Sequence, residues 1–274
     1  MLNFPLNDVT FKNIRDFIYD RSGIFISDTK KYLIENRLAR IVKENNLGSF
    51  DDYLHLLKHS PNGIELNRLF DAVTTNETYF YREPQQLQVF VDGIIPALIK
   101  QKKGSAPLKI WSAACSTGEE PYTISMMLME KNINQNSFEV YASDISEGVL
   151  DSAKSGVYNS YSIRNVPPNC LSKYFTNKGQ TYSLDPKVKK TVKFMKANLV
   201  EESNLKAFRG ADAIFCRNVL IYFDIKAKQK AVSNLYNNLN PGGYLFIGTS
   251  ESLHNITRAL RPLVIEKVVT YQKI

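Results

Sequence analysis

The chain of 274 residues is poor in the residues that build metal centres, disulfide frameworks and membrane spans. Its three cysteines, Cys115, Cys170 and Cys216, form no C-x-x-C pair, which argues against a structural zinc site and for reduced thiols. It holds only three histidines, and we expect no metal site. No apolar run approaches the roughly 20 residues of a membrane helix, and the first residues do not resemble a secretory signal. We therefore expect a cytoplasmic protein that is not itself a membrane protein.

The net charge of +8 is unevenly distributed along the chain. Residues 1–75 carry ten basic and ten acidic side chains, so this part is neutral. Residues 151–197 carry nine Lys and Arg against only Asp151 and Asp185, a net charge of +7. A basic surface of this kind indicates an acidic partner. A well-hydrated surface without a partner explains the same charges, and the composition does not separate the two readings.

The most informative segment follows an apolar run at Leu108–Trp111, which predicts a buried strand. Small residues up to Gly118 predict a tight turn, and Glu119-Glu120 then open an apolar helical run. In α/β sheets of this kind, ligands bind beyond the carboxyl end of the first strand. A phosphate would favour a helix N-terminus without acidic side chains. The acidic turn therefore predicts a ligand with positive charge, such as S-adenosylmethionine (SAM), which carries an ammonium and a sulfonium.

Residues 1–75 show helical spacing of apolar side chains throughout and predict an all-helical domain. Asp28 is placed to cap the second helix. Ser49 and Asp52 have the spacing of a capping box before the third helix. Pro61 suits the first turn of a fourth helix.

After an interdomain segment at 76–91, the pattern over 92–274 alternates between expected helices and strands. The helices are expected at about 84–103, 146–155 and 226–238, and the strands at 108–111, 138–143, 192–197, 213–216 and 244–248, with a closing hairpin within 263–274. This alternation predicts a mostly parallel sheet covered on both faces. Residues from about 156 to 190 interrupt the alternation with prolines and tyrosines and predict an inserted lobe, which carries much of the positive charge.

Acidic side chains mark the ends of the first two expected strands. Asp144 stands where an acid accepts hydrogen bonds from both hydroxyls of a ribose, although it also suits a helix N-cap. Glu119 and Glu120 can each pair with an α-ammonium group, but acids in a first helical turn are favourable without any ligand. Spacing does not say which of the two faces a ligand.

Polar residues also follow later strands. Asn198, Arg217 and Asn218 stand at expected carboxyl ends, where the ligand crevice of an open α/β sheet lies, and could read an adenine edge. Tyr222 follows four residues after Asn218 and either faces the same crevice or is an ordinary half-buried tyrosine.

Four motifs occur in order: TTNETYFYRE, WSAACSTGEEPYTI, YASDIS and IFCRNVLIYFD. Together they resemble the chemotaxis-receptor protein-glutamate methyltransferases of the CheR type, and the resemblance covers nearly the whole chain. It implies a Rossmann-like SAM-dependent methyltransferase with an all-α N-terminal domain and a small inserted β lobe. It also implies methyl transfer from SAM to receptor glutamates, with a γ-glutamyl methyl ester and S-adenosylhomocysteine as products.

The resemblance implies a set of cofactor-binding residues in the interdomain segment and at strand ends: Asn76, Thr78, Arg82, Glu120, Asp144, Asn198, Leu199, Arg217 and Asn218. In this set Glu120 would hold the amino group of SAM and Asp144 its ribose. The pair at 198–199 would hold the adenine. Alignment with the family prefers Glu120 over its neighbour.

Arg82 and Tyr222 are the residues that the family places nearest the transferred methyl group. A glutamate with an ordinary pKa of about 4.3 is already anionic at neutral pH, so the reaction needs no general base. The sulfonium is a good leaving group and needs no general acid. Arg82 and Tyr222 would therefore orient the acceptor carboxylate, a task that contributes up to roughly 7–11 kcal/mol.

The implied partners are methyl-accepting chemotaxis receptors, whose methylation helices are acidic. Arg37, Arg40 and Lys43 project from one face of the second expected helix and could dock such a helix. In relatives the inserted lobe can bind a peptide tether at the receptor's C-terminus. Here the loop at 176–190 looks shorter, which makes tether binding doubtful and favours direct docking.

Other functions fit the sequence less well. A nicotinamide dehydrogenase expects G-x-G-x-x-G after the first strand, where this chain has A-A-C-S-T-G. A methyltransferase acting on nucleic acid or on another acidic target is the alternative. However, the chain lacks the N/D-P-P-Y/F segment of amino-methylating enzymes, and no proline precedes Cys216 as in C5-methylating ones. We therefore expect no nucleic-acid partner. A docking module without activity is the third alternative, against which the complete set of pocket residues argues.

Overall fold

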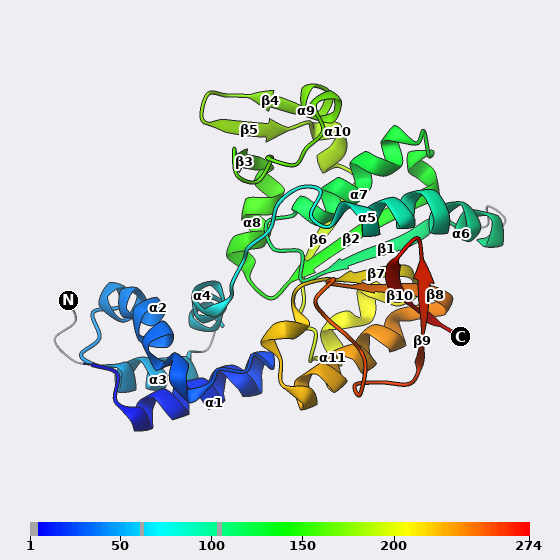
Figure 1. The fold of residues 1–274 in the computed structure, drawn as a ribbon. Helices are drawn as coiled ribbons and strands as arrows, with labels where there is room; N and C mark the ends of the chain where they lie inside the picture. The colour runs from blue at the N-terminus through cyan, green and yellow to red at the C-terminus, as the bar shows by residue number, and fades with distance from the viewer. Residues whose placement is uncertain (1–4, 61–62, 103–105) are drawn as a thin grey trace. The chain divides into compact units, whose positions relative to one another are not determined.

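The computed structural model describes residues 5–60, 63–102 and 106–274, and it divides into two compact units (Figure 1). The first unit comprises the residues up to Thr75 together with Tyr222–Ala227. The second comprises Asn76–Ile221 and Lys228–Ile274. Within the described residues, no helix combines the length and apolar character needed to cross a membrane.

The first unit is all-helical, as predicted. Its helices are α1 (Asp8–Ser22), α2 (Lys31–Glu44), α3 (Phe50–His59) and α4 (Ile64–Val73). Each has one apolar stripe, because its buried side chains recur every three or four residues. Ile14, Ile18 and Leu38 are fully buried among these stripes, and Leu69 of α4 completes the core.

The helix ends show which capping predictions hold. The Ser49 hydroxyl oxygen accepts the Asp52 N–H at 3.1 Å, so this predicted cap is confirmed. The prediction for Asp28 is wrong: it lies in a 3₁₀ turn, Asp28–Lys30, ahead of α2, and its carboxylate pairs with Arg15 of α1 instead of capping α2. Arg15 competes with the N-terminus of α2 for the Asp28 carboxylate, and the local sequence pattern does not reveal this competition. Pro61 lies outside the described residues.

The segment Tyr222–Ala227 belongs to the first unit through three contacts. The Phe25 N–H donates to the Tyr222 carbonyl at 2.8 Å, and Ile24 forms an antiparallel bridge with Phe223. The Tyr19 hydroxyl donates to the Asp224 carboxylate at 3.1 Å.

The second unit is built on a mixed seven-stranded sheet in the order β6-β2-β1-β7-β8-β10-β9. In that order the strands are Val192–Lys196, Phe138–Asp144, Leu108–Ala113, Ala211–Cys216, Leu239–Ile247, Val268–Lys273 and Leu260–Ile265. The first five are parallel, and β10 and β9 add an antiparallel hairpin. The predicted Rossmann-like sheet is confirmed, and the carboxyl ends of its parallel strands meet at one edge.

Helices cover both faces of this sheet, as its apolar strands require. Helices α7 (Glu119–Glu130) and α8 (Glu147–Ser155) lie on one face and α11 (Ile225–Asn238) on the other (Figure 1). Strand β7 is buried along its whole length. Trp111 of β1 stacks on Phe208 with ring centroids 4.2 Å apart, and its indole N–H donates to the Ser143 hydroxyl at 2.9 Å. These contacts give the strand ends a rigid base.

The helix expected at 84–103 forms with an irregular centre. It consists of α5 (Pro84–Gln88), a π-helical stretch Val89–Ile94, and α6 (Ile95–Lys102). The predicted end at 103–104 lies outside the described residues. Pro96 lacks an N–H for the carbonyl four residues earlier, and the wider π-helical turn lies where a regular helix would need that bond.

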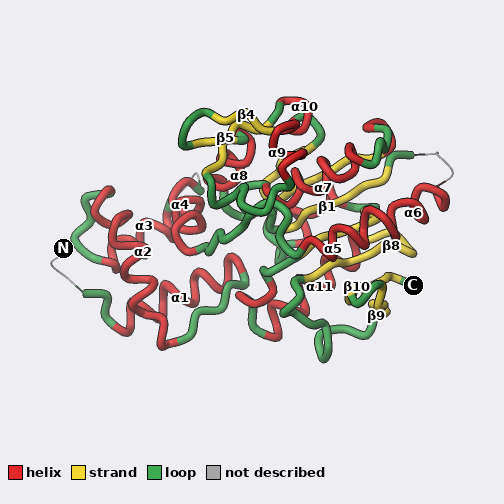
Figure 2. Tube along the Cα trace, turned by 45° about the horizontal axis from the view of Figure 1, so that its top comes forward, coloured by secondary structure: helices red, strands yellow, loops and turns green. Residues whose placement is uncertain are grey.

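The stretch from about 156 to 190, which interrupts the alternation of helices and strands, forms the predicted β lobe. Strands β3 (Val157–Asn159), β5 (Thr181–Leu184) and β4 (Phe175–Asn177) pair antiparallel in a small separate sheet. The short helices α9 (Pro168–Tyr174) and α10 (Pro186–Lys189) lie beside β4 and β5 (Figure 2).

Gly118, in the turn between β1 and α7, provides a test of this packing. Its φ is +90°, and an added Cβ would lie 2.9 Å from the Ala153 Cβ and 3.1 Å from the Phe194 ring. We expect Gly118→Ala to lower the free energy of unfolding by about 3 kcal/mol, from left-handed strain and overpacking together. Gly179→Ala is the matched control, because Gly179 has φ +79° but no atom within 4 Å of the added Cβ. Urea denaturation should show a loss of about 1 kcal/mol there; equal losses in the two variants would contradict the packing.

Candidate functional site

The turn after β1 brings the first two strand ends together. Ala114 and Ser116 adopt left-handed φ values of +59° and +50°, and the Cys115 N–H between them donates to the Ser143 carbonyl of β2 at 2.9 Å. The Ser116 N–H donates to one Asp144 carboxylate oxygen at 2.9 Å, and the Ser146 N–H donates to the other at 3.0 Å. Asp144 is 6% exposed. Its carboxylate therefore joins the loop after β1 to the loop after β2.

The structure separates the two neighbouring glutamates. Glu119 is 1% exposed and accepts the Thr117 hydroxyl at 2.7 Å. Glu120 instead accepts the Ser112 hydroxyl of β1 at 2.6 Å and pairs with Arg217 at 3.0 Å. Glu120 thus lies at the carboxyl ends of β1 and β7, and Glu119 points away from that position.

Arg217 is the charged centre of this edge. Its side chain is 2% exposed and lies between two carboxylates, Glu120 and Glu83, the latter at 3.2 Å. One guanidinium nitrogen also donates to the Arg82 carbonyl at 2.7 Å. Arg217 therefore joins the end of β7, the start of α7 and the segment before α5.

The segment at 76–83 packs firmly within the second unit. The Asn76 carbonyl accepts the Ser116 hydroxyl at 3.3 Å, which places this segment next to the turn after β1. The buried ring of Phe80 meets the edges of Tyr158 and Phe175 in the β lobe. The Arg82 guanidinium donates to the Glu77 carbonyl at 2.8 Å.

The remaining predicted cofactor residues lie at or near the same edge. Asn198, two residues beyond β6, is half-buried and accepts the Val200 N–H at 3.2 Å. Leu199 is buried, and its carbonyl accepts an amide N–H of Asn234 at 2.8 Å. Asn218 follows Arg217 with a left-handed φ of +59°, and Thr78 is half-buried in the segment before α5.

Four predicted residues lie in the first unit instead. Tyr222 ends the short 3₁₀ helix Leu220–Tyr222. Arg37 is half-buried and donates to the carbonyls of Val73 and Thr74, so it closes the end of α4. The other two project from α2: the Arg40 side chain is 85% exposed and pairs with Glu44, and Lys43 is exposed.

Two carboxylates of this edge were not singled out by the sequence. Glu83 stands inside one of the recognised motifs, but nothing there distinguishes it from its neighbours. Glu251 follows β8 in the sequence Gly-Thr-Ser-Glu and carries no pattern of its own. Burial acts to raise the pKa of Glu83, but the charge of Arg217 and hydrogen bonds hold it below its usual value, so Glu83 is anionic at neutral pH.

Burial makes the two cysteines nearest the edge poor nucleophiles. It raises the pKa of the Cys115 and Cys216 thiols well above the usual value, and neighbouring carboxylates add to the shift. Both side chains are buried. Chemistry through a cysteine thiolate therefore does not fit this site.

Two family models match the chain. The model for the CheR methyltransferase SAM-binding domain matches residues 76–269, and the model for the CheR methyltransferase all-alpha domain matches residues 10–74. The chain belongs to the CheR methyltransferase family. Its α/β unit is thus the SAM-binding domain of a CheR methyltransferase, and SAM is its cofactor.

Curated relatives in three bacteria agree with this assignment. Chemotaxis protein methyltransferase 2 of Vibrio cholerae is 36% identical over 276 residues, which cover 100% of this chain and 96% of the relative. The chemotaxis protein methyltransferase of Borreliella burgdorferi is 36% identical and covers 92% of this chain and 91% of its own. Chemotaxis protein methyltransferase 1 of Pseudomonas aeruginosa is 35% identical, with coverage of 90% and 91%.

The charged residues at the carboxyl edge of the sheet fit the ammonium and carboxylate groups of SAM. Glu120 offers an acceptor for an ammonium group at the carboxyl ends of β1 and β7. The Nε donor of Arg217 is buried and has no hydrogen-bond partner among the described residues. An α-carboxylate is an acceptor that would satisfy such a donor, and an unsatisfied buried donor costs about 1–3 kcal/mol. A ligand that carries both an ammonium and a carboxylate therefore suits Glu120 and Arg217 together.

Glu119 yields a prediction on pH. Burial raises the pKa of this carboxyl, so the folded protein favours its protonated form. Wild-type stability from this group is present below the unfolded pKa of about 4.3 and is lost as pH rises through the folded pKa. Glu119→Gln cannot ionise, so its melting temperature relative to wild type should be higher at pH 8 than at pH 5. Glu202→Gln on the exposed surface controls for the lost carboxyl; a difference that does not change with pH would refute the burial argument.

Proposed function

We propose that this protein methylates glutamate side chains of chemotaxis receptors, with SAM as the methyl donor. The observation that carries the proposal is the Glu120–Arg217–Glu83 cluster at the carboxyl edge of the sheet, which suits the charged end of SAM. Membership of the CheR family supports the reaction, and the names of the curated relatives support the pathway. The products are a glutamyl methyl ester and S-adenosylhomocysteine.

The reaction asks for alignment rather than acid–base catalysis. Bound SAM would supply an electrophilic methyl group carried on a sulfonium. The acceptor carboxylate is already anionic, so no proton has to be moved. We assign the alignment of that carboxylate to the Arg82 guanidinium and the Tyr222 hydroxyl, since both groups can donate a hydrogen bond to a carboxylate.

The cofactor contacts follow the positions of the side chains. Glu120 takes the amino group and Arg217 the carboxylate of the donor, and Asp144 takes the ribose hydroxyls. The backbone and side chains at Asn198 and Leu199 take the adenine. Three further residues complete the set: Asn76 and Thr78 from the segment before α5, and Asn218 from the loop after β7.

The acceptor-aligning pair can be tested directly. We expect Arg82→Ala to lower kcat about 100-fold, in line with the loss of one preorganised donor. Tyr222→Phe should lower it at least tenfold, since a hydrogen bond to a charged group contributes about 1.5–3 kcal/mol. The assay measures alkali-labile methyl transferred from labelled SAM to receptor-bearing membranes. Arg261→Ala, at an exposed position, and Tyr236→Phe, on α11, are matched controls. Near-normal transfer by the first two variants would defeat the assignment.

We further propose that receptors dock directly on α2 rather than through a peptide tether. The β4–β5 hairpin of the lobe is short, with strands of three and four residues. Because Arg37 is bonded within the first unit, the exposed charges of Arg40 and Lys43 carry the docking. These charges suit acidic methylation helices.

Charge reversal tests this docking. The double variant Arg40→Glu/Lys43→Glu should raise the KM for receptor at least fivefold at low salt and leave kcat within twofold. Raising the salt should narrow the difference, because exposed charges are screened within about 8–10 Å near physiological ionic strength. Lys12→Glu/Lys58→Glu changes the net charge equally at exposed positions on α1 and α3. Equal KM values for the two double variants would rule out a dock on α2.

A further inference from the structure

Glu251 has an arrangement of hydrogen bonds that the cofactor contacts do not explain. One of its carboxylate oxygens accepts the N–H of Gly248 at 2.7 Å and the N–H of Asn218 at 2.8 Å. The other accepts the Ile221 N–H at 3.2 Å. A single side chain after β8 therefore holds three backbone amides, two of them in the loop that follows β7.

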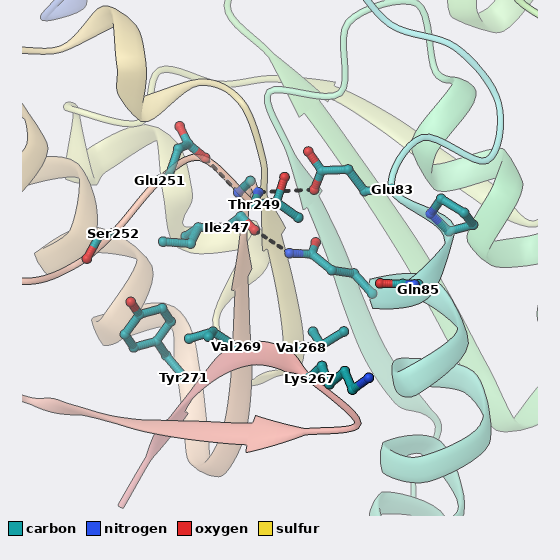
Figure 3. A pocket seen from close by; sticks show the side chains of 13 residues that line it. Glu83, Gln85, Ile247, Thr249, Glu251, Ser252, Lys267, Val268, Val269 and Tyr271 are labelled. Atoms are coloured by element: carbon teal, nitrogen blue, oxygen red, sulfur yellow. Dashed lines mark hydrogen bonds between the residues drawn. The ribbon is translucent and has the colours of Figure 1, made fainter.

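Glu83 holds the opposite side of the same loop. Its carboxylate accepts the Asn218 side-chain amide at 3.3 Å and the Thr249 N–H at 3.2 Å, besides its pair with Arg217. Figure 3 shows Glu251 and Glu83 on opposite sides of Thr249, at the rim of a cavity of about 470 Å³. Asn218 is thus held by one carboxylate through its backbone and by the other through its side chain.

The fit around this carboxylate clamp, Glu83 and Glu251, is tight. A Cβ on Gly248 would lie 2.7 Å from the Asn218 side-chain nitrogen and 2.8 Å from the Glu251 carboxylate. Asn218, Tyr81 and Glu83 have left-handed φ values of +59°, +58° and +51°. Such conformations cost about 1–3 kcal/mol each and persist only where surrounding contacts hold them. The clamp supplies such contacts to Asn218, in the loop after β7, and to Glu83, in the segment before α5.

We propose that Glu251 is a positioning residue for methyl transfer. It fixes the loop Asn218–Ile221, which leads directly along the chain to Tyr222. Through Asn218 and Glu83 it also fixes the segment that carries Arg82. The inference rests on the proposed function, in which Arg82 and Tyr222 align the acceptor carboxylate. In this role Glu251 acts through the backbone that it holds and not through a contact of its own with cofactor or acceptor.

Two substitutions at Glu251 should lower kcat to different degrees. Glu251→Gln keeps one acceptor oxygen, which can serve the shared position of Gly248 and Asn218, but it turns an NH₂ group toward the Ile221 N–H. Glu251→Ala removes all three acceptors. We expect kcat to fall about tenfold in the first variant and about 100-fold in the second, while the Kd for S-adenosylhomocysteine rises by a smaller factor, because Asn218 is only one of several cofactor contacts. Glu202→Gln, at the exposed start of the 3₁₀ helix Glu202–Phe208, is the matched control and should leave kcat unchanged.

Hydrogen–deuterium exchange measures the positioning without the reaction. The amides in peptides covering 217–222 should exchange faster in Glu251→Gln than in wild type, while those of β1 should be unchanged. A uniform rise in exchange, or a parallel loss of kcat, cofactor affinity and melting temperature, would overturn the role because it would show general destabilisation.

The kinetic outcomes separate this inference from the proposed function. Full receptor methylation by Glu251→Ala, with wild type active, would overturn the positioning role alone. Wild-type protein that transfers no methyl group to receptors would overturn both the reaction and the role in it.

Discussion

The buried guanidinium of Arg217 is the interaction on which the site depends. A charge with a side chain 2% exposed is tolerated only when it is paired, and removing a partner from such a pair costs roughly 3–5 kcal/mol. Its partners Glu83 and Glu120 come from segments that lie far apart in the sequence, and Arg82 adds its carbonyl. The pairing therefore fixes the end of β7, the start of α7 and the segment before α5 relative to one another.

Around this centre the site carries more negative than positive charge. Glu83, Glu120, Glu251 and Asp144 line or approach the carboxyl edge, and Arg217 is the cation that pairs with two of them. A site with this balance suits a ligand that brings its own positive charge and hydrogen-bond donors. It also suits a reaction that needs no proton transfer.

Strand-end reasoning located most of the candidate site from the sequence. Asp144, Glu120 and Arg217 each follow or adjoin a strand that its apolar run reveals, and parallel strands must bring their carboxyl ends to one edge. The same reasoning could not find Glu251, because its partners are backbone amides and leave no side-chain pattern. Helix patterns were also incomplete: they made Asp28 a cap, although its carboxylate pairs with Arg15 of α1, and they did not reveal the π-helical stretch Val89–Ile94.

Local patterns were enough to predict the helical first part, the parallel sheet with its inserted lobe, and the family. Periodicity and turn residues report local burial, and motifs report ancestry. The folded arrangement was needed to see that Glu120 rather than Glu119 meets Arg217, that Arg37 closes a helix within its own unit, and that two carboxylates hold Asn218. These pairings depend on which groups lie close enough in the folded chain to compete for the same hydrogen bond. The spacing of residues in the sequence does not show which groups these are.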